Sequence, residues 1–554
     1  MLALFTHVVA NPFDPPPGYA PVAPPYEAGE TWPKIAGATG ATVTIGSTVL
    51  RNATPYALGT NVPVYWGRKF SRDADQRAQL AAGPQFLRWP GGTPANEYVW
   101  SSKCAGAADT TPCWKEHPYF LKFQGQYGSA YLQTPDEFIA TCKAVNCIPL
   151  VQANAAIALV ESVANATAMA LDLLHYLKQG GLDVRHVAFG NENYGPWEVP
   201  YGDVPVDGEL YGNAFTEWVE GMRREFPDVA YGVVGLWTPG DGAATTAHAA
   251  AERCARAGRT AAAAAACTRA LGAGYGVIEN WMPDMLSKTE AVRKADFLIL
   301  HDYFDKATDE PAPSAATLIQ RDLDQLHAMR QGVADFISNS TAPTTPMPPL
   351  ALTEFQIAFP SSSAGNATET LASAVFLASV IGETLAAAPV NALTEFAWHA
   401  KWFSKGNRSG GYGSYAFGHP DPSVPEGTLA PKYYASWLWR KACGDSVLAA
   451  SSSTATLKVY ATRFAGGEHG LVLINTEEAA AASVTLAGVK GRINGWVLSA
   501  AGGGAMMAPV VAVNGVDNGL SWGAPWPPPA PYAAMSDAAI DVPPASVTAV
   551  IVYE

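Results

Sequence analysis

The chain has 554 residues, of which 48% are hydrophobic and 15% charged, and its formal net charge is −14. This composition supplies a large apolar core, and the length predicts more than one domain. The negative charge argues against a nucleic-acid partner, because phosphate backbones require clustered Lys and Arg. The sequence contains no run of about 20 apolar residues, so no membrane-spanning helix is predicted.

The first residues are apolar, and a Pro-rich stretch follows them. In MLALFTHVVA, Val8 and Ala10 stand where a signal-cleavage site needs small residues, but a basic n-region is lacking. This pattern fits a trimmed or atypical signal and a plain N-terminus equally well. Residues 11–33 are rich in Pro and are expected to be extended. We therefore predict a Pro-rich arm over residues 1–37, followed by a β-strand region at 38–54 that joins a later β-domain.

Sequons and cysteines favour an extracellular protein. Pairs of cysteines that are close in sequence suit short disulfide loops in an oxidising compartment, with reduced thiols as the alternative. The expected pairs are Cys104 with Cys113, Cys142 with Cys147 and Cys254 with Cys267, which leaves Cys443 alone. The Asn-x-Ser/Thr sequons stand at Asn52, Asn165, Asn339, Asn366 and Asn407. These features predict a secreted, extracellular glycoprotein, with the cell wall as one such location.

Eight short apolar runs alternate with helical patterns through the middle of the chain. Near-continuous apolar runs are typical of parallel strands that are covered on both faces. Eight strand–helix units in series predict an α/β fold of the (β/α)8 TIM-barrel type over residues 55–442. The expected strands lie at 56–66, 85–89, 147–154, 185–192, 229–237, 295–304, 349–355 and 391–399.

After residue 442 the pattern changes to alternating strands separated by Gly, Ala and Pro turns. Runs such as ATLKVYATRF, HGLVLINT and ASVTAVIVYE are typical of strands with one buried face. We predict an all-β sandwich domain over residues 443–554.

Two carboxylates end barrel strands on opposite sides of the predicted mouth. Glu192 ends the fourth strand (VAFGNE) and Glu354 ends the seventh (LALTE). Hydrolysis of a glycosidic bond needs one carboxyl to protonate the leaving oxygen and another to attack the anomeric carbon. The pair therefore indicates such chemistry, although each glutamate could instead be a buried partner of Arg88 or of a histidine.

Several motifs around these carboxylates resemble the family 51 α-L-arabinofuranosidases, which are retaining glycoside hydrolases of clan A. The segment GNENYGPWE (190–198) is similar to the Gly-Asn-Glu acid/base signature of that clan. FLRWPGGTPANEYVW (86–100) is similar to the Arg-x-Pro-Gly-Gly segment after strand two, although Thr93-Pro94-Ala95-Asn96-Glu97 departs from the family. HDYF (301–304) resembles the family's His-x-Tyr, and LTEF (352–355) resembles its nucleophile strand.

The resemblance implies a role for each matching residue. Glu192 would be the acid/base and Glu354 the nucleophile of a double displacement. Asn191 would donate to the sugar 2-hydroxyl, and Arg88 would lie beneath Glu354 and lower its pKa by charge. Tyr303 would hydrogen-bond Glu354, and His301 would contact the sugar or Glu192.

Other substrate-binding candidates stand at or near strand ends. Trp237 and Trp398 could form aromatic walls of a sugar subsite, with core packing as the alternative. Asn154 could bind a hydroxyl, and Glu97 is an extra carboxylate near the mouth or only a loop charge.

The resemblance implies an oligo- or polysaccharide substrate and requires neither a metal nor an organic cofactor. Two alternatives to an arabinofuranosidase stay open. One is another clan A glycosidase, of the β-glucuronidase/heparanase, β-xylosidase or β-glucanase type. The other is a non-catalytic carbohydrate-binding or cell-wall structural protein built on a hydrolase barrel. Exo or endo action and the oligomeric state are left open by the sequence.

Overall fold

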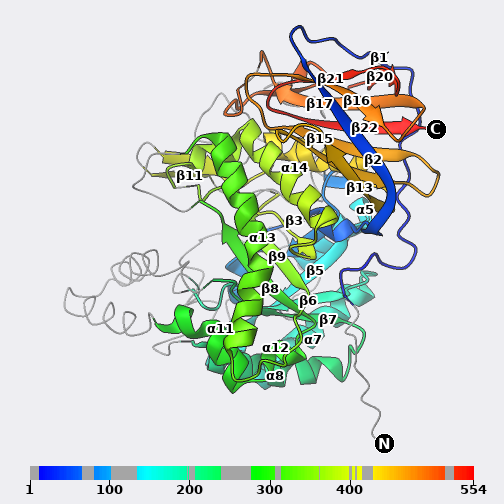
Figure 1. Cartoon of the computed structure of the whole chain (residues 1–554). Coiled ribbons are helices and arrows are strands. Elements are labelled where there is room, and N and C mark those ends of the chain that lie inside the picture. The colour runs from blue at the N-terminus through cyan, green and yellow to red at the C-terminus, as the bar shows by residue number, and fades with distance from the viewer. Residues whose placement is uncertain are drawn as a thin grey trace, which may run out of the picture.

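The computed structural model describes residues 11–64, 80–100, 134–195, 198, 206–238, 276–305, 313–360, 362–398, 402–405, 408–414, 428–503, 505–517 and 529–554. A barrel and a β-rich domain lie against each other, with the β-rich domain uppermost in Figure 1. None of the helices in these residues is long and apolar enough to cross a membrane.

Eight parallel strands form the barrel, each paired with the next in chain order. They are β3 (Gly59–Asn61), β4 (Phe86–Trp89), β5 (Ile148–Ala153), β6 (His186–Phe189), β7 (Ala230–Val234), β8 (Phe297–Tyr303), β9 (Leu350–Gln356) and β10 (Ala392–Leu393). A parallel bridge between Thr60 and Glu395 joins the last strand region to the first and closes the barrel. Each strand coincides with one of the eight apolar runs, although β9 extends one residue beyond its run, so the TIM-barrel prediction is confirmed.

Helices cover the outer face of the barrel, which explains why the strands are buried on both faces. Every residue of β8 and β9 is buried. Side-chain caps fix several helix starts, including Thr134, Ser162 and Asp207, each of which accepts a hydrogen bond from the helix backbone. The helices are α2 (Pro94–Glu97), α5 (Pro135–Val145), α6 (Ala155–Val160), α7 (Val163–Gln179), α8 (Gly208–Arg223), α11 (Gly276–Lys288), α12 (Ala291–Lys294), α13 (Ala315–Asn339), α14 (Leu371–Ala386) and α15 (Pro431–Ala442). Two short 3-10 helices cover Pro55–Ala57 and Gly365–Glu369.

The β-domain combines strands from both ends of the chain. The long strand β2 (Thr39–Asn52) lies between β13, to which it is antiparallel, and β16, to which it is parallel. The other strands of this sheet are β1 (Glu30–Thr31), β13 (Ser446–Ser452), β14 (Leu457–Arg463), β15 (His469–Asn475), β16 (Ala482–Ala487), β17 (Arg492–Ala500), β18 (Val511–Val513), β19 (Val516–Asp517), β20 (Tyr532–Met535), β21 (Ile540–Val542) and β22 (Ser546–Tyr553). Alternate residues of these strands form a second apolar core, so the predicted C-terminal β-domain is confirmed.

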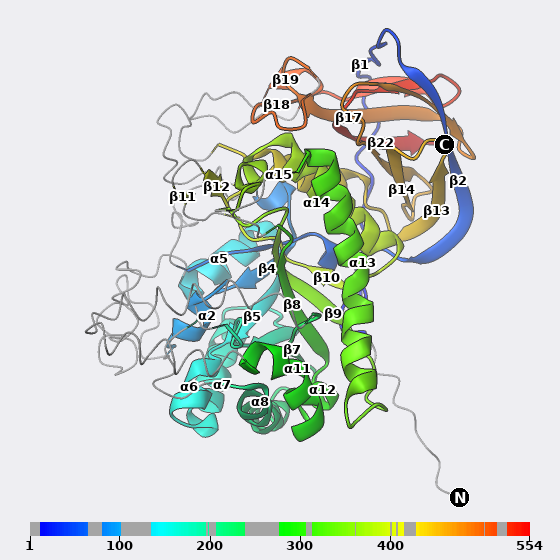
Figure 2. The same cartoon turned by 60° about the vertical axis from the view of Figure 1, so that its left-hand side comes forward.

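Helices α14 and α15 lie between the barrel and the β-domain (Figure 2). The two helices are tied together by Trp439, whose indole N–H donates to the carbonyl of Ala378 at 2.9 Å. Tyr460 of β14 packs against Gly382, where an added Cβ would lie 2.4 Å from the ring. The Tyr460 hydroxyl also donates to Glu383 at 2.8 Å. These contacts fix the β-domain against the barrel.

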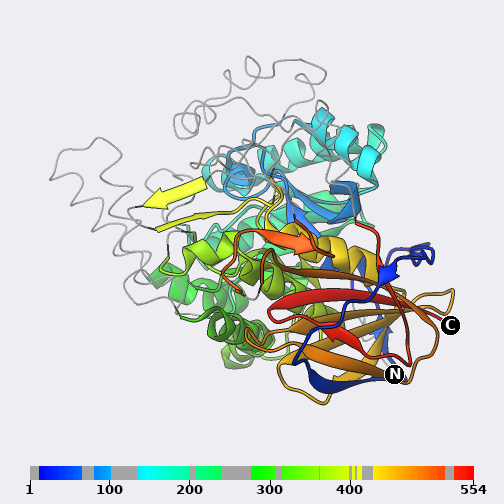
Figure 3. The same ribbon diagram turned by 90° about the horizontal axis from the view of Figure 1, so that it is seen from above.

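Figure 3, seen from above, shows the hairpin of β11 (Trp402–Lys405) and β12 (Arg408–Gly411) projecting away from the β-domain.

The N-terminal arm closes the bottom of the barrel with one aromatic ring. Phe13 is 1% exposed and packs against the first residues of β4, β6 and β8, which are Phe86, His186 and Phe297. Its ring stacks on His186 at 5.2 Å with an interplanar angle of 9°. His186 Nε2 also lies 2.8 Å from the carbonyl oxygen of Pro12. The start of the arm is therefore part of the barrel core.

Replacing Phe13 should destabilise the protein without touching the other end of the barrel. We expect Phe13→Ala to lower the free energy of unfolding by about 3–5 kcal/mol, because a buried ring that fills a core is lost. Denaturant or thermal unfolding measures the change. Val22→Ala is the matched control in the same arm, since Val22 is 87% exposed. Equal stability of the two variants would contradict this role for Phe13.

One disulfide prediction and the free thiol can be compared with the structure. Cys142 and Cys147 form a disulfide across the end of α5, and Cys443 is free and buried, both as expected. Cys104, Cys113, Cys254 and Cys267 lie outside the described residues, as does the sequon at Asn407. The remaining sequon asparagines are all exposed: Asn52, Asn165, Asn339 and Asn366. Their glycosylation remains a prediction.

Candidate active site

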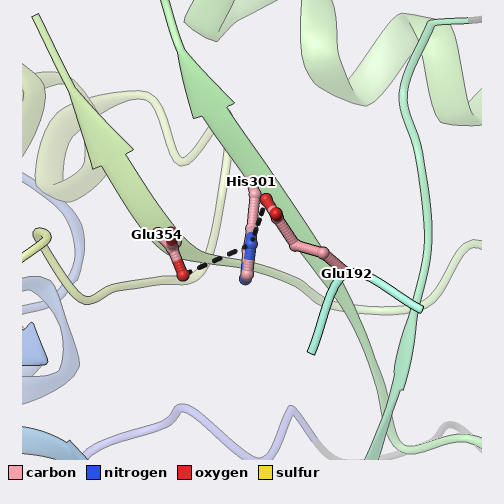
Figure 4. A group of neighbouring side chains, drawn as sticks. All are labelled: Glu192, His301 and Glu354. Carbon is pink, nitrogen blue, oxygen red and sulfur yellow. Dashed lines mark hydrogen bonds and ion pairs between the residues drawn. The ribbon is translucent and has the colours of Figure 1, made fainter. Parts of the chain in front are cut away.

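Glu192, His301 and Glu354 converge at the C-terminal end of the barrel strands (Figure 4). Glu192 follows β6, whereas His301 belongs to β8 and Glu354 to β9. One carboxylate oxygen of each glutamate and one ring nitrogen of His301 all lie within 4.8 Å of one another. His301 Nδ1 is 2.9 Å from Glu192 Oε1 and 3.6 Å from Glu354 Oε2. The histidine therefore lies between the two carboxyl groups and contacts both.

A local irregularity in the sheet aims these side chains. Leu300 of β8 pairs with Leu352 of β9, but the next residue, His301, pairs with Glu354, so Thr353 is an extra residue in β9. Bulges of this kind redirect side chains and are common beside active sites. The hydroxyl of Thr353 lies 3.0 Å from His301 Nε2. The bulge thus places His301 and Glu354 at the mouth and also holds the imidazole ring.

Arg88 brings a buried positive charge to the base of the site. Its side chain is fully buried, and Nη1 lies 3.2 Å from Glu354 Oε2 and 2.7 Å from Asn61 Oδ1. Nη2 donates to Asn191 Oδ1 at 2.6 Å. The guanidinium group thus binds the Glu354 carboxylate and two amide oxygens at once, and its fixed fork makes it rigid.

The pKa of Glu354 is set by opposing influences. Burial raises it above the ordinary value for a glutamate, and the negative charge of Glu192 acts in the same direction. The charges of His301 and Arg88 and the hydrogen bond from the Tyr303 hydroxyl lower it. Arg88 was expected to lower the pKa of Glu354 by its charge. The lowering influence is present, but the net shift is upward because burial outweighs it.

Glu192 is held in an unusual backbone conformation. Its φ is 39°, which lies in the left-handed region that few side chains adopt. Gly190, two residues earlier, has a φ of 83°, and a Cβ there would lie 2.2 Å from Asn193 Oδ1. A glycine is therefore required at this turn. The turn places Glu192 beyond the end of β6. Its side chain is 13% exposed, whereas that of Glu354 is 7% exposed.

A hydrogen-bonded network that the sequence analysis did not identify surrounds Asn191. Glu198 is 2% exposed, and its two oxygens accept from Asn191 Nδ2 at 3.0 Å, Asn96 Nδ2 at 2.8 Å and Thr93 Oγ1 at 3.0 Å. Asn96 Nδ2 also donates to the backbone oxygen of Asn191 at 2.6 Å. Gln152 of β5 lies 3.5 Å from Asn191 Oδ1. The signal was available, because Glu198 ends the same motif as Glu192, and Asn96 stands where the chain departs from the family pattern.

The remaining candidates make structural contacts or lie outside the described side chains. Asn154 caps α6 by accepting from the N–H of Ile157, and its amide donates to the carbonyl of Tyr98 at 3.1 Å. Trp237 packs against Gly332 of α13, outside the strands. Asn154 and Trp237 thus make structural contacts, and a role in sugar binding remains a prediction for both.

Trp398 is fully buried, and its ring centroid lies 6.0 Å from that of Tyr433 in α15. A ring buried in this way packs as part of the core and not as an open wall. Glu97 ends α2, and its side chain lies outside the described part of the structure. Glu395 is buried and forms an ion pair of 2.7 Å with Lys432, as a structural partner would.

The spacing of Glu192, His301 and Glu354 would also suit a metal ion, since all three residue types are metal ligands. The guanidinium of Arg88 already places a positive charge 3.2 Å from Glu354. A divalent cation at the three ligand atoms would therefore lie next to a buried cation. The residues fit proton transfer better than metal binding, and independence from metal remains a prediction that a chelator can test.

Solved structures with this architecture are known. No protein-family model matches the chain, and no curated protein matches its sequence. The family 51 α-L-arabinofuranosidase of Thermotoga petrophila matches with a TM-score of 0.60 at 14% identity, over 93% of this chain and 100% of that one. The arabinose complex of the α-L-arabinofuranosidase from Thermotoga maritima matches with a TM-score of 0.57 at 15% identity, over 93% and 99%.

A family 44 xyloglucanase from Paenibacillus polymyxa has a TM-score of 0.54 at 14% identity, over 93% of this chain and 100% of that one. The likeness to these three proteins covers both the barrel and the β-domain. The chain therefore has the two-domain fold of the family 51 arabinofuranosidases and the family 44 enzymes.

Proposed function

We propose that this protein is a retaining glycoside hydrolase whose substrates are α-L-arabinofuranosides. The observation that carries the proposal is the distance between the two carboxylates, with oxygens of Glu192 and Glu354 within 4.8 Å. Retaining glycosidases hold their two carboxyl groups about 5–5.5 Å apart, whereas inverting enzymes need about 6.5–9.5 Å to admit a water. The motifs after strands two, four, six and seven, together with the solved structures of like fold, favour the arabinofuranoside.

The two glutamates have different surroundings, and these suit different roles. Glu354, in contact with Arg88 and Tyr303, attacks the anomeric carbon as a carboxylate. Glu192, which is more exposed and contacts His301, gives its proton to the leaving oxygen as the C–O bond breaks. In the second step Glu192 takes a proton from water, the water oxygen bonds to the anomeric carbon, and Glu354 leaves.

A panel of aryl glycosides tests the proposal. Nitrophenyl or methylumbelliferyl α-L-arabinofuranoside, β-D-xyloside, β-D-glucoside and β-D-glucuronide are compared by kcat/KM, and the anomer released first is identified by NMR. The expected result is fastest cleavage of the arabinofuranoside with retention. Preference for another glycoside would indicate a different glycosidase on the same fold. Sugar binding without turnover on any glycoside would indicate a carbohydrate-binding protein.

The raised pKa of Glu354 predicts the acidic side of the pH profile. Glu354 must be ionised to attack, so kcat/KM should fall as the pH drops through the pKa of Glu354 in the free enzyme. Because that pKa is raised, the fall should occur above about pH 4.3, the ordinary value for glutamate. An activated aryl glycoside assayed from pH 3 to 8 measures it. A profile that stays flat down to pH 4 would contradict the upward shift.

We further propose that the protein is a secreted glycoprotein. Four exposed sequons and the Cys142–Cys147 disulfide support this location. The host's culture medium should contain the protein, and enzymatic deglycosylation should lower its mass. An intracellular protein whose mass does not change would contradict this proposal.

A further inference from the structure

Glu198 is a third carboxyl of the site, and no step of the proposed mechanism uses it. Its side chain is 2% exposed, and none of the Lys, Arg or His side chains that the structure describes forms an ion pair with it. A buried carboxyl without a counter-ion is costly unless hydrogen bonds satisfy it. Glu198 has three such bonds, from Thr93, Asn96 and Asn191.

These bonds join two loops that flank the catalytic pair. Thr93 and Asn96 belong to the segment that follows β4, and β4 itself supplies Arg88. Asn191 immediately precedes Glu192. Asn96 reinforces the link by bonding both the backbone N–H and the backbone carbonyl of Asn191, at 3.2 and 2.6 Å. A change at Glu198 is therefore transmitted directly to Asn191.

Arg88 and Glu198 together fix the orientation of the Asn191 amide, because one donates a hydrogen bond to it and the other accepts one from it. Oδ1 accepts from Arg88 Nη2 at 2.6 Å, and Nδ2 donates to Glu198 Oε1 at 3.0 Å. A flipped amide would turn its NH2 group toward the guanidinium and its oxygen toward the carboxyl. Both contacts would then be lost. Among the described residues Nδ2 donates to Glu198 alone, so its second N–H can donate to a further acceptor.

Only a carboxyl satisfies both amide donors at this position. Asn191 Nδ2 bonds one oxygen of Glu198, and Asn96 Nδ2 bonds the other. A glutamine has a single side-chain oxygen, so one of the two amides would face an NH2 group. The Thr93 hydroxyl can either donate or accept, so the arrangement also holds when Glu198 carries a proton.

We propose that Glu198 is a positioning residue that fixes the Asn191 amide so that it donates to the 2-hydroxyl of the sugar during glycosyl transfer. The inference rests on the proposed function. Burial raises the pKa of Glu198 well above its usual value, and the charge of Glu192 adds to this, so both influences favour the neutral carboxyl. Its effect is therefore geometric, and removing it should not shift the pH limits of activity.

The test combines Glu198→Gln with a substrate that lacks the 2-hydroxyl. On the aryl glycoside that the wild type cleaves fastest, we expect kcat to fall about 10- to 100-fold with a smaller change in KM, since misplaced groups lose transition-state contacts. On the 2-deoxy analogue the variant should differ from the wild type less than about 3-fold, because the contact is already absent. In Asn191→Ala the same substitution should add little. The pH limits should match those of the wild type.

Equal losses on the two substrates, additive losses with Asn191→Ala, or shifted pH limits would overturn the inference. Glu383→Gln is the matched control, a carboxyl-to-amide change between α14 and β14 that should leave kcat unchanged. If Glu198→Gln does not fold, Thr93→Val replaces it, with an expected loss of about 3- to 10-fold on the parent substrate only. A wild type that hydrolyses no glycoside refutes the proposed function, whereas an active wild type with an unaltered Glu198→Gln refutes this inference alone.

Discussion

Glu354→Gln is expected to lower kcat on every glycoside by on the order of 10⁴-fold or more, because an amide cannot form the glycosyl–enzyme bond. This is the largest effect we predict. Initial rates and single-turnover measurements check it, with Glu383→Gln as the control. If a variant purified free of wild type retains more than about a hundredth of the activity, Glu354 is not the nucleophile.

Stability must be measured together with this loss. Glu354 is the ion-pair partner of a fully buried guanidinium, and removing one member of a buried pair costs about 3–5 kcal/mol. A lower Tm is therefore expected for Glu354→Gln, and inactivity alone would be ambiguous. Trapping the wild type with a 2-fluoro glycoside resolves this, since the peptide that contains Glu354 should gain the mass of the sugar. Labelling of any other residue would contradict the assignment.

Glu192→Ala should show a loss that depends on the leaving group. Proton donation contributes about 10²–10⁴-fold, so kcat/KM should fall by that factor on a methyl or oligosaccharide leaving group. On a dinitrophenyl glycoside the leaving group needs no proton, and the loss in kcat/KM should be far smaller. Measuring kcat/KM across a series of leaving-group pKa values tests the role.

The same variant offers a second readout. Azide needs no base to attack the glycosyl–enzyme, so it should restore turnover of the dinitrophenyl glycoside by Glu192→Ala and yield a glycosyl azide. Equal losses on good and poor leaving groups, with no rescue by azide, would show that Glu192 is not the acid/base.

The barrel and the carboxylate pair could be predicted from the sequence because both leave local signals. Strands that are covered on two faces begin as apolar runs, and β8 (FLILHDY) and β9 (LALTEFQ) show this before their polar ends. Functional residues then stand at the C-terminal ends of the runs, as Glu192 and Glu354 do. The position of a residue along its strand was enough to indicate which end of the barrel it would reach.

The contacts that could not be predicted join residues far apart in sequence. The closure of the barrel bottom by Phe13 depends on four aromatic rings from different segments. The buried state of Glu198 depends on Asn96, about a hundred residues earlier. Trp398 stands near the end of the predicted eighth run, where a wall residue would lie, but it is fully buried and packs against Tyr433 of α15. The position of a residue on its strand predicts which end of the barrel its side chain reaches. Whether that side chain is buried depends on the helices and loops that pack over it.

Strand β2 has a consequence for biosynthesis. It is made before every strand and helix of the barrel, yet its partners β13 and β16 follow the last barrel helix. During translation β2 therefore has no partner strand until the ribosome has passed the entire barrel, and exposed strand edges promote aggregation. For the same reason the β-domain cannot be excised as one continuous fragment. A circular permutant in which residue 554 is linked to residue 11, with new ends between β2 and β3, would bring all its strands together in one stretch.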